Sequence, residues 1–236
     1  MELGELAAHY DSLVVLDVET SGLSPQRNEI IELAAARVEG TEVVERYDQF
    51  LRLSPGTRLD RRITELTGIT QADLEQEGIP KETACRDLQS LLSHGKTLLA
   101  AYNAQFDLAF LYHFLLRDGD PAALDGVDFL DALTVFKDRR PYPHKLRNAI
   151  EAYELGGKVV NSHRAIDDVL ATVEVLSAMA AERGDLVHYI NLFGFHPKYG
   201  VSGRPLAKVL YAPQPYGSHP PLYETARPTA APLARG

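Results

Sequence analysis

Two carboxylates separated by one residue, Asp17 and Glu19, lie at the end of a short apolar segment near the start of the chain, at residues 13–18. Residues i and i+2 of a β-strand point to the same face, so both carboxylates project together. Two carboxylates repel each other by about 4 kcal/mol at 4 Å in an effective dielectric near 20, and a cation between them removes that cost. A second pair with this spacing, Asp73 and Glu75, lies in a polar stretch. We therefore expect the second pair at the surface and the first pair in a crevice where ligands bind.

Two further polar clusters stand at the starts of expected helices. Asn103 could cap one such helix, and Asp107 could be either a ligand or an end charge that the helix dipole favours. His163 and Asp168 are five residues apart across the start of a second helix, so both can converge on a site beyond its end. Adjacent helical residues diverge by about 100°, so only one of Asp167 and Asp168 can face the site. Asp168 is expected to face inward, because it lines up at helical spacing with Ala165, Thr172 and Val175, and Asp167 is expected to face solvent.

The elements that must position these groups alternate between strands and helices. The segments that favour strands are residues 13–18, 30–38, 43–53, 97–102 and 127–130, with a hairpin turn at 39–41. The segments that favour helices are residues 80–92, 106–116, 145–153 and 164–181. Three adjacent strands followed by alternating helices and strands predict an α/β protein with a mixed five-stranded sheet flanked by helices.

Composition narrows the class of protein further. The 236 residues are 45% hydrophobic and 24% charged, with one cysteine and no apolar run long enough for a membrane span. The single cysteine excludes an intramolecular disulfide and a CxxC-type zinc site, and Cys85 is expected in the core. The acidic start lacks a signal-peptide pattern, so a cytoplasmic location is predicted.

The charge is distributed unevenly along the chain. The net charge of −9 divides into −12 for residues 1–184 and +3 for residues 185–236. An acidic body repels a phosphate backbone unless bound cations reverse the field locally. Residues 137–147 carry five Lys and Arg against one Asp; they could track a phosphate backbone, and a solvated loop is the alternative.

A change of composition near residue 184 predicts two parts, a domain at residues 1–184 and a basic extension at residues 185–236. The extension holds eight of the 14 prolines and five of the 11 tyrosines. Its apolar stretch at residues 189–195 is expected to pack on the main domain. The last 15 or so residues are expected to be loosely ordered.

Taken together, in this order and on these elements, the three clusters resemble the DEDDh 3′–5′ exonucleases. These DnaQ-like enzymes of the ribonuclease H-like fold include the proofreading exonuclease domains of bacterial polymerase III, ribonuclease T and oligoribonuclease. The resemblance covers about residues 12–182. Residues 17–23 look like the first motif, residues 103–107 like the second and residues 163–168 like the third, with Tyr102 where histidine is frequent. Residues 63–70 are similar to a segment of the polymerase-associated branch.

The resemblance implies a metal-dependent enzyme that releases nucleoside 5′-monophosphates from single-stranded or frayed DNA 3′ ends, in proofreading or repair. It implies that two Mg²⁺ or Mn²⁺ ions are held by four carboxylates, namely Asp17, Glu19, Asp107 and Asp168. His163 would take a proton from the attacking water. The implied substrate contacts are Thr20, Leu23, Asn103 and Phe106, although Phe106 could instead be a core residue.

Two other functions stay open at the level of sequence. One is an RNA-trimming exoribonuclease of the same family, because the metal site does not sense the 2′-hydroxyl. The other is a scaffold module whose basic extension docks on a DNA polymerase or on a clamp; the exonuclease function also allows a DNA polymerase as partner. No membrane partner is expected. A small-molecule phosphatase is disfavoured because the chain lacks a phosphate-cradling glycine loop.

Overall fold

The computed structural model describes residue 3 and residues 6–40, 42–159, 164–201, 203–217 and 219–227. The strands are β1 (Ser12–Thr20), β2 (Ile30–Glu39), β3 (Glu42–Phe50), β4 (Thr97–Ala101), β5 (Asp128–Asp131), β6 (Leu192–Phe195) and β7 (Leu210–Pro213). The α-helices are α1 (Leu6–His9), α2 (Arg61–Thr67), α3 (Gln71–Gln76), α4 (Lys81–Leu92), α5 (Ala104–Asp118), α6 (Ala132–Arg139), α7 (Leu146–Ala152), α8 (Ala165–Glu182) and α9 (Leu222–Thr225). Two 3₁₀ turns, η1 (Pro121–Leu124) and η2 (Leu186–Tyr189), complete the described elements.

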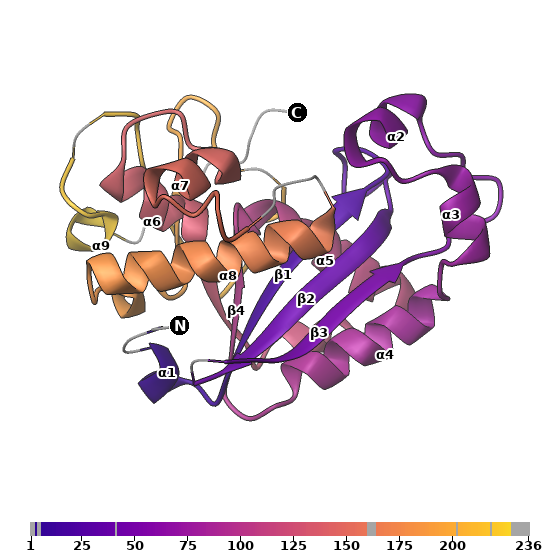
Figure 1. Cartoon of the computed structure of the whole chain (residues 1–236), viewed down its shortest axis with the longest axis horizontal. Helices are drawn as coiled ribbons and strands as arrows, with labels where there is room; N and C mark the ends of the chain where they lie inside the picture. The colour runs from indigo at the N-terminus through magenta and orange to yellow at the C-terminus, as the bar shows by residue number, and fades with distance from the viewer. Residues whose placement is uncertain are drawn as a thin grey trace.

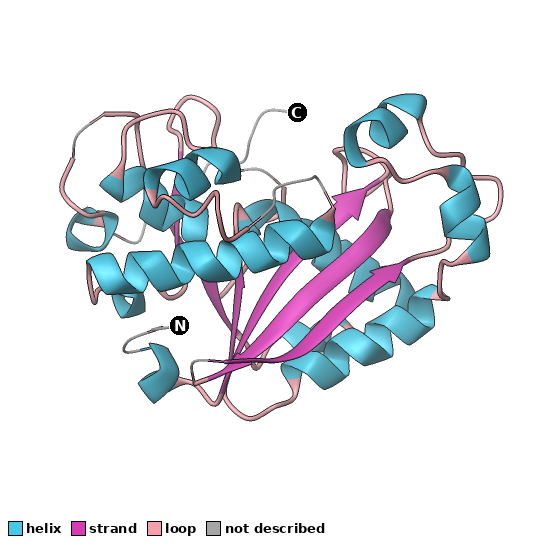
Figure 2. Cartoon of the chain, viewed as in Figure 1, coloured by secondary structure: helices cyan, strands magenta, loops and turns pink. Residues whose placement is uncertain are grey.

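The strands β1 to β5 form one mixed sheet in the order β3-β2-β1-β4-β5, with helices on both of its sides (Figure 2). The pairs β1–β2 and β2–β3 are antiparallel hairpin partners, whereas β1, β4 and β5 run parallel. Parallel neighbours need a long connection, and α4 and α5 supply helices for the two crossovers. This arrangement confirms the mixed five-stranded sheet of a ribonuclease H-like fold.

The two faces of β1 pack against different helices. Leu13 and Val15 join the cluster of buried residues that includes α8, while Val14 and Leu16 join the cluster of α4 and α5. Helix α8 accordingly lies across one face of the sheet, and α4 and α5 lie on the other (Figure 1). Because side chains alternate along a strand, Asp17 continues the face that Leu13 and Val15 present to α8.

The C-terminal extension packs on the sheet domain through both core clusters. Leu186 and Tyr189 are buried with α8, and Phe193 and Tyr211 are buried with α5. The strands β6 and β7 form a small parallel sheet of their own. The amide of Asn191, which precedes β6, donates to the carbonyl of Phe129 in β5 over 2.7 Å. The expectation that residues 189–195 pack on the main domain is confirmed, whereas a domain boundary near residue 184 stays a prediction.

Several short helices escaped the sequence analysis. Helix α2 has only seven residues, held by the Asp60 cap and by Gly68 with φ of 76°. Helix α3 starts with a capping box in which the side chains and backbone of Thr70 and Asp73 bond reciprocally. Asp73 and Glu75 therefore lie in a surface helix, as expected, and Asp73 caps its start. Helix α9 lies in a stretch for which little order was expected, and residues 228–236 lie outside the described part.

Both interpretations of the basic segment, a phosphate-tracking loop and a solvated loop, are wrong for Arg139. The side chain of Arg139 is only 1% exposed and forms ion pairs with Asp185 and Glu182. It also donates to the carbonyl oxygen of Met179 at 2.6 Å. Arg139 thus holds the end of α6 against the end of α8 and is neither solvated nor open to a phosphate. Lys145 and Arg147 are exposed.

The surroundings of Cys85 and the character of the helices bear on two further expectations. Cys85 is buried among the apolar residues of α4 and α5, as expected, and burial raises the pKa of its thiol to about 12. Among the described residues, no helix combines the length and the apolar character that crossing a membrane requires.

Candidate active site

The candidate site begins where β1 runs on past its parallel neighbour. The last residue pair between β1 and β4 is Val15 with Ala100, whereas β1 continues to Thr20 paired, among the described strands, with β2 alone. Asp17 and Glu19 lie in this overhang and are half-buried. The overhang exposes one strand edge at the carboxyl end of the sheet, which is the usual place for a ligand site in α/β proteins.

Asp107 closes one side of the overhang. It lies in the first turn of α5, is 2% exposed, and its Oδ1 accepts a hydrogen bond from the Val18 amide at 3.2 Å. Val18 stands between Asp17 and Glu19, so this bond holds the carboxylate of α5 beside both strand carboxylates. The alternative of a simple helix-end charge is not sufficient, because the Asp107 side chain is bonded to another element.

Asp168 closes the other side from the first turn of α8. Burial raises the pKa of Asp17 well above its usual value, and the charges of Asp107, Asp168 and Glu19 raise it further. Burial, Glu32 and Asp168 likewise raise the pKa of Glu19 to about 8. The four carboxylates that the sequence singled out therefore act on one another from three separate elements.

The neighbour of Asp168 lies on a different side of α8. The charge of Asp167 acts on Asp48 of β3 and on Arg164, and Asp167 is half-buried. The expectation that Asp168 faces inward agrees with this geometry, whereas Asp167 is less exposed to solvent than expected.

A fifth carboxylate, Glu32, was missed by the sequence analysis. Glu32 is fully buried on β2 directly opposite Glu19 in the strand register. Its Oε1 pairs with the guanidinium of Arg164 at 2.8 Å, and its Oε2 accepts from the Ala165 amide at 3.0 Å. Glu32 therefore fixes the first residue of α8, three residues before Asp168. Its position between apolar residues of a nearly continuously buried strand could have suggested a buried acid, but not its partner.

Asp131 plays the corresponding part for α5. It is 4% exposed at the end of β5, and its Oδ1 accepts from the amides of Asn103 and Ala104, each at 3.0 Å. The same carboxylate caps α6 through the amides of Leu133 and Thr134. Asn103 itself is exposed and has a φ of 72°, a left-handed conformation that asparagine tolerates. Asp131 thus holds the turn that precedes Asp107.

The other predicted substrate contacts surround the overhang. Thr20 is buried, and its hydroxyl donates to the Gly22 carbonyl at 2.8 Å inside the turn after β1. Leu23 is 85% exposed in that turn. Phe106 is half-buried with its ring centroid 5.0 Å from that of Phe110, so it is partly a core residue and partly accessible. An exposed leucine beside a carboxylate cluster is suited to contact an apolar part of a substrate.

His163 opens the third sequence motif, and Tyr102 directly precedes the second. His163 lies outside the described residues, and its role stays a prediction. Tyr102, where the resembling family often has histidine, donates from its hydroxyl to the carbonyl oxygen of His144 at 2.9 Å. Tyr102 thus contacts the loop before α7.

The donor set fits hard divalent cations. It consists of carboxylate oxygens, which Mg²⁺ and Mn²⁺ prefer, and the groups repel one another in a partly dehydrated crevice that positive charge would stabilise. Within the described ranges, no three acidic, histidine or cysteine side chains already stand in metal-holding geometry. The fold sets the positions of the four carboxylates on β1, α5 and α8, and their side-chain torsions can adjust when an ion binds.

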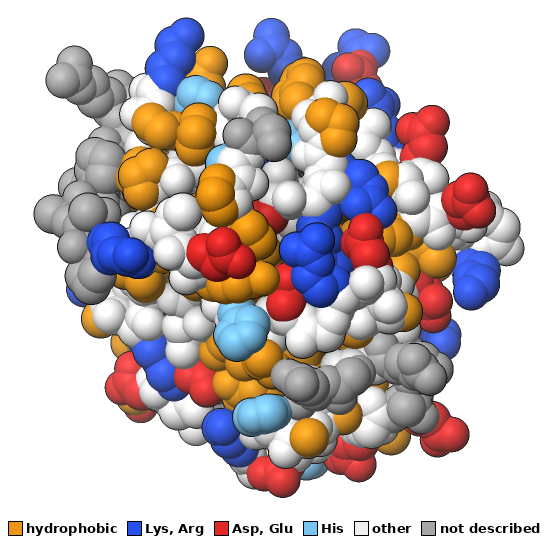
Figure 3. Space-filling model, turned by 90° about the vertical axis from the view of Figure 1, so that its left-hand side faces the viewer, with side chains coloured by type: hydrophobic (Ala, Val, Ile, Leu, Met, Phe, Trp, Pro, Cys, Tyr) orange, Lys and Arg blue, Asp and Glu red, His pale blue; other side chains and the backbone are white. Residues whose placement is uncertain are grey.

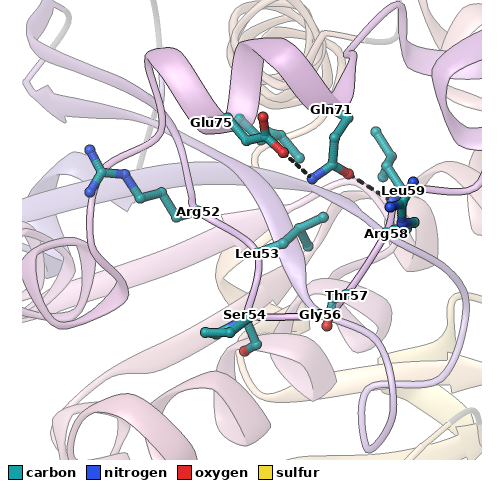
Figure 4. A pocket seen from close by; sticks show the side chains of 11 residues that line it. Arg52, Leu53, Ser54, Gly56, Thr57, Arg58, Leu59, Gln71 and Glu75 are labelled. Carbon is teal, nitrogen blue, oxygen red and sulfur yellow. Dashed lines mark hydrogen bonds between the residues drawn. The ribbon is translucent and has the colours of Figure 1, made fainter.

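A wide cavity of about 740 Å³ lies apart from the four carboxylates, between the loop at residues 52–59 and α3 (Figure 4). Its polar groups bond largely to one another: Gln71 donates to Glu75 at 2.9 Å and accepts from the Leu59 amide at 3.0 Å. Arg52 extends away from the other labelled side chains. None of the four carboxylates lines this cavity, and it is not the candidate active site.

Comparisons with known proteins agree with this fold. Residues 14–176 match the family model RNase_T, described as exonuclease, and this range includes all four carboxylates. The chain is 37% identical over 183 residues to a PolC-type DNA polymerase III of Halalkalibacterium halodurans and 35% identical over 188 residues to that of Bacillus subtilis. These matches cover 74% and 75% of the chain but only 12% of each polymerase. The chain thus spans about a tenth of the length of these relatives.

Solved structures show the same fold. Escherichia coli Exonuclease I in complex with a dA16 oligonucleotide superposes with a TM-score of 0.68 at 21% identity, over 76% of this chain and 42% of that one. A moderately thermophilic Exonuclease I from Methylocaldum szegediense superposes with a TM-score of 0.64 at 23% identity, over 75% of this chain and 42% of that one. At this level of identity the likeness concerns the fold.

Proposed function

The chain belongs to the exonuclease family RNase_T, and from that premise we propose that it is a divalent-metal-dependent 3′–5′ exonuclease acting on single-stranded or frayed DNA ends. The proposed products are nucleoside 5′-monophosphates. One observation carries the proposal: Asp17 and Glu19 of β1, Asp107 of α5 and Asp168 of α8 come together at one place, where Asp107 bonds to the Val18 amide and the charges of Asp107 and Asp168 raise the pKa of Asp17.

In the proposed mechanism Asp17, Glu19, Asp107 and Asp168 would hold two Mg²⁺ or Mn²⁺ ions. When bound, these ions would supply positive charge for the phosphate oxygens and make the attacking water more acidic. Asp107 is kept in place by the Val18 amide, and Asp168 by the fixed start of α8. The turn that carries Thr20 and Leu23 and the α5 start that carries Asn103 and Phe106 would orient the terminal nucleotide.

We assign the general base to His163 on the strength of the sequence motif. A neutral imidazole is needed to accept the proton of the water, and the reference pKa of histidine is near 6.5. The rate of the chemical step should therefore rise with pH through the neutral range in the wild type. A profile that stays flat from about pH 5 to 9 contradicts this assignment.

DNA is the favoured substrate because the relatives in sequence are DNA polymerases and a structural neighbour was solved with a DNA oligonucleotide. An RNA-trimming activity is the second candidate, since the carboxylate cluster by itself does not read the sugar. Work together with a DNA polymerase in proofreading or repair is part of the proposal, and so is the cytoplasmic location.

The test compares hydrolysis of 5′-labelled DNA and RNA strands of one sequence. We expect stepwise shortening from the 3′ end with Mn²⁺ or Mg²⁺, none with chelator, and faster hydrolysis of DNA. The Asp168→Ala variant should lose at least about 100-fold in rate, and Asp73→Ala, at the second acidic pair, should not. If the folded wild-type protein releases no nucleotide with Mn²⁺, the exonuclease proposal is wrong and the scaffold function is favoured.

A further inference from the structure

Three tyrosines expose large parts of their rings on one surface. The exposed fractions are 67% for Tyr142, 58% for Tyr199 and 51% for Tyr216. Ring contacts connect them through two histidines: the centroid distances are 5.2 Å for Tyr142–Tyr216, 4.6 Å for Tyr216–His196 and 4.9 Å for His196–Tyr199. His144 completes the group at 5.8 Å from both Tyr142 and Tyr216. We call these five residues the aromatic platform.

The platform is assembled from two distant parts of the chain. Tyr142 and His144 lie in the loop between α6 and α7, inside the family match, whereas His196, Tyr199 and Tyr216 belong to the extension beyond residue 176. The end of the molecule that carries α6, α7 and α9 shows hydrophobic and histidine side chains next to one another on its surface (Figure 3). A cluster of accessible rings that two segments build together is typical of a binding surface.

Two structural links join the platform to the candidate active site. The hydroxyl of Tyr102, which directly precedes Asn103, donates to the carbonyl of His144 at 2.9 Å. A cavity of about 120 Å³ has both Asn103 and His196 in its lining, together with Lys137. The platform is therefore continuous with the α5 start, where the substrate contacts of the terminal nucleotide are proposed.

The chemistry of the platform suits nucleobases. Every base has a π-face, and aromatic side chains stack on bases without regard to sequence. Cations accompany the rings: the ammonium of Lys198 lies 5.3 Å from the centroid of Tyr199, and Lys145 follows His144 in the chain. Positive charge at this place offsets locally the repulsion between the acidic body and a phosphate backbone.

We propose that the aromatic platform stacks the bases of a single nucleic acid strand on the 5′ side of the nucleotide held at the carboxylates. The proposal rests on the proposed function and extends it, because it assigns the extension a part in substrate binding. The platform gives the protein a preference for longer single strands over dinucleotides.

The test measures binding and hydrolysis separately. Binding of 5′-labelled eight-nucleotide DNA and RNA strands is followed by fluorescence anisotropy in chelator, which prevents cleavage. We expect Tyr142→Ala/Tyr216→Ala to weaken binding by about 10-fold or more. Tyr142→Phe/Tyr216→Phe should bind like the wild type, since it keeps both rings. Leu116→Ala, which truncates another exposed apolar side chain, should change nothing.

Hydrolysis of strands from two to eight nucleotides completes the design. In the wild type KM should fall as the strand is lengthened, whereas in the double alanine variant it should stay near the dinucleotide value. The kcat for a dinucleotide should be equal in both proteins, and that equality also shows that the variant folds. If the double alanine variant loses binding to DNA and to RNA strands equally, the platform stacks on bases irrespective of the sugar. If it loses binding to only one of them, that one is the strand that the platform accepts.

The proposal and the proposed function fail in different ways. If the alanine variant binds eight-nucleotide strands as tightly as the wild type, the platform does not stack bases. That result overturns the proposal even if the same surface binds a protein partner. If the wild type hydrolyses no strand but the alanine variant still loses binding, the platform stands and the exonuclease function is wrong.

Discussion

Oε2 of Glu32 accepts a hydrogen bond of 3.0 Å from the amide of Ala165, so a strand residue opposite Glu19 sets the start of the helix that carries Asp168. Because Glu32 also pairs with Arg164, two consecutive residues of the chain are held by one buried carboxylate. The geometry makes Glu32 a positioning residue of the candidate site.

Replacing Glu32 by alanine should affect both stability and activity. The Ala165 amide would lose its acceptor in a buried place, which costs about 1–3 kcal/mol of unfolding free energy. A displaced Asp168 should lower kcat by about 10-fold or more, because small misplacements of reacting groups are costly. Urea denaturation and single-turnover kinetics measure the two effects. Glu42→Ala, at an exposed position of β3, is the control, and wild-type kcat in Glu32→Ala would exclude the positioning role.

The metal-free protein should lose stability between pH 6.5 and 8. The pKa of Glu19 is about 8 in the folded protein and near 4.5 in the unfolded chain, so the folded state binds the proton more tightly. Its stabilising share is complete below pH 4.5 and is lost as the pH rises through about 8. The window starts at pH 6.5 because burial lowers the pKa values of His113 and His144. These two histidines make stability rise with pH, but only below about pH 6.5, the pKa of histidine in the unfolded chain.

Thermal unfolding in chelator at several pH values measures this dependence. Glu19→Gln cannot ionise and should unfold at a more constant midpoint across the window. Adding Mg²⁺ should stabilise the wild type more at pH 8 than at pH 6.5, because the ion binds ionised carboxylates. Equal slopes for the wild type and Glu19→Gln would show that Glu19 is already ionised at neutral pH.

Removing the carboxylate of Asp131 should destabilise the protein and weaken substrate binding. Alanine would leave the buried donors of Ala104 and Thr134 without an acceptor, and we expect a loss of about 3 kcal/mol from the cap and the unpaired amides together. KM should rise because Asn103 is no longer held. The matched control is Asp120→Ala, which removes the cap of the exposed turn η1 and should cost about 1 kcal/mol or less. A similar loss for both variants would contradict the special role of Asp131.

Shortening Leu23 should change substrate binding alone. With 85% of Leu23 exposed, Leu23→Ala should leave the unfolding free energy within about 0.5 kcal/mol of the wild type. Loss of its contact with a terminal base should raise KM about fivefold at unchanged kcat. Steady-state kinetics on a short single strand, with Leu116→Ala for comparison, provides the measurement. An unchanged KM would place the terminal base elsewhere.

The local pattern of the chain was sufficient for much of the fold and of the site. Alternation along the first strand put Asp17 and Glu19 on one face, and the helical period turned Asp168 rather than Asp167 toward them. These inferences hold because strand and helix periods follow from backbone geometry and the burial of apolar residues. The short helices α2 and α3 were missed because few apolar residues mark so short an element, and α6 was missed because its eight residues are too few to show a helical period.

Contacts between distant segments were beyond the reach of such patterns. The sequence by itself determined which residues could be ligands: the acidic side chains that follow buried strands or open helices. Only the tertiary structure decided that Glu32 holds α8, that Asp131 holds α5, that Arg139 is buried in ion pairs, and that tyrosines 74 residues apart share a surface. The physical reason is that strand register and helix docking are set by burial of the whole core, so a partner across the fold leaves no local signal.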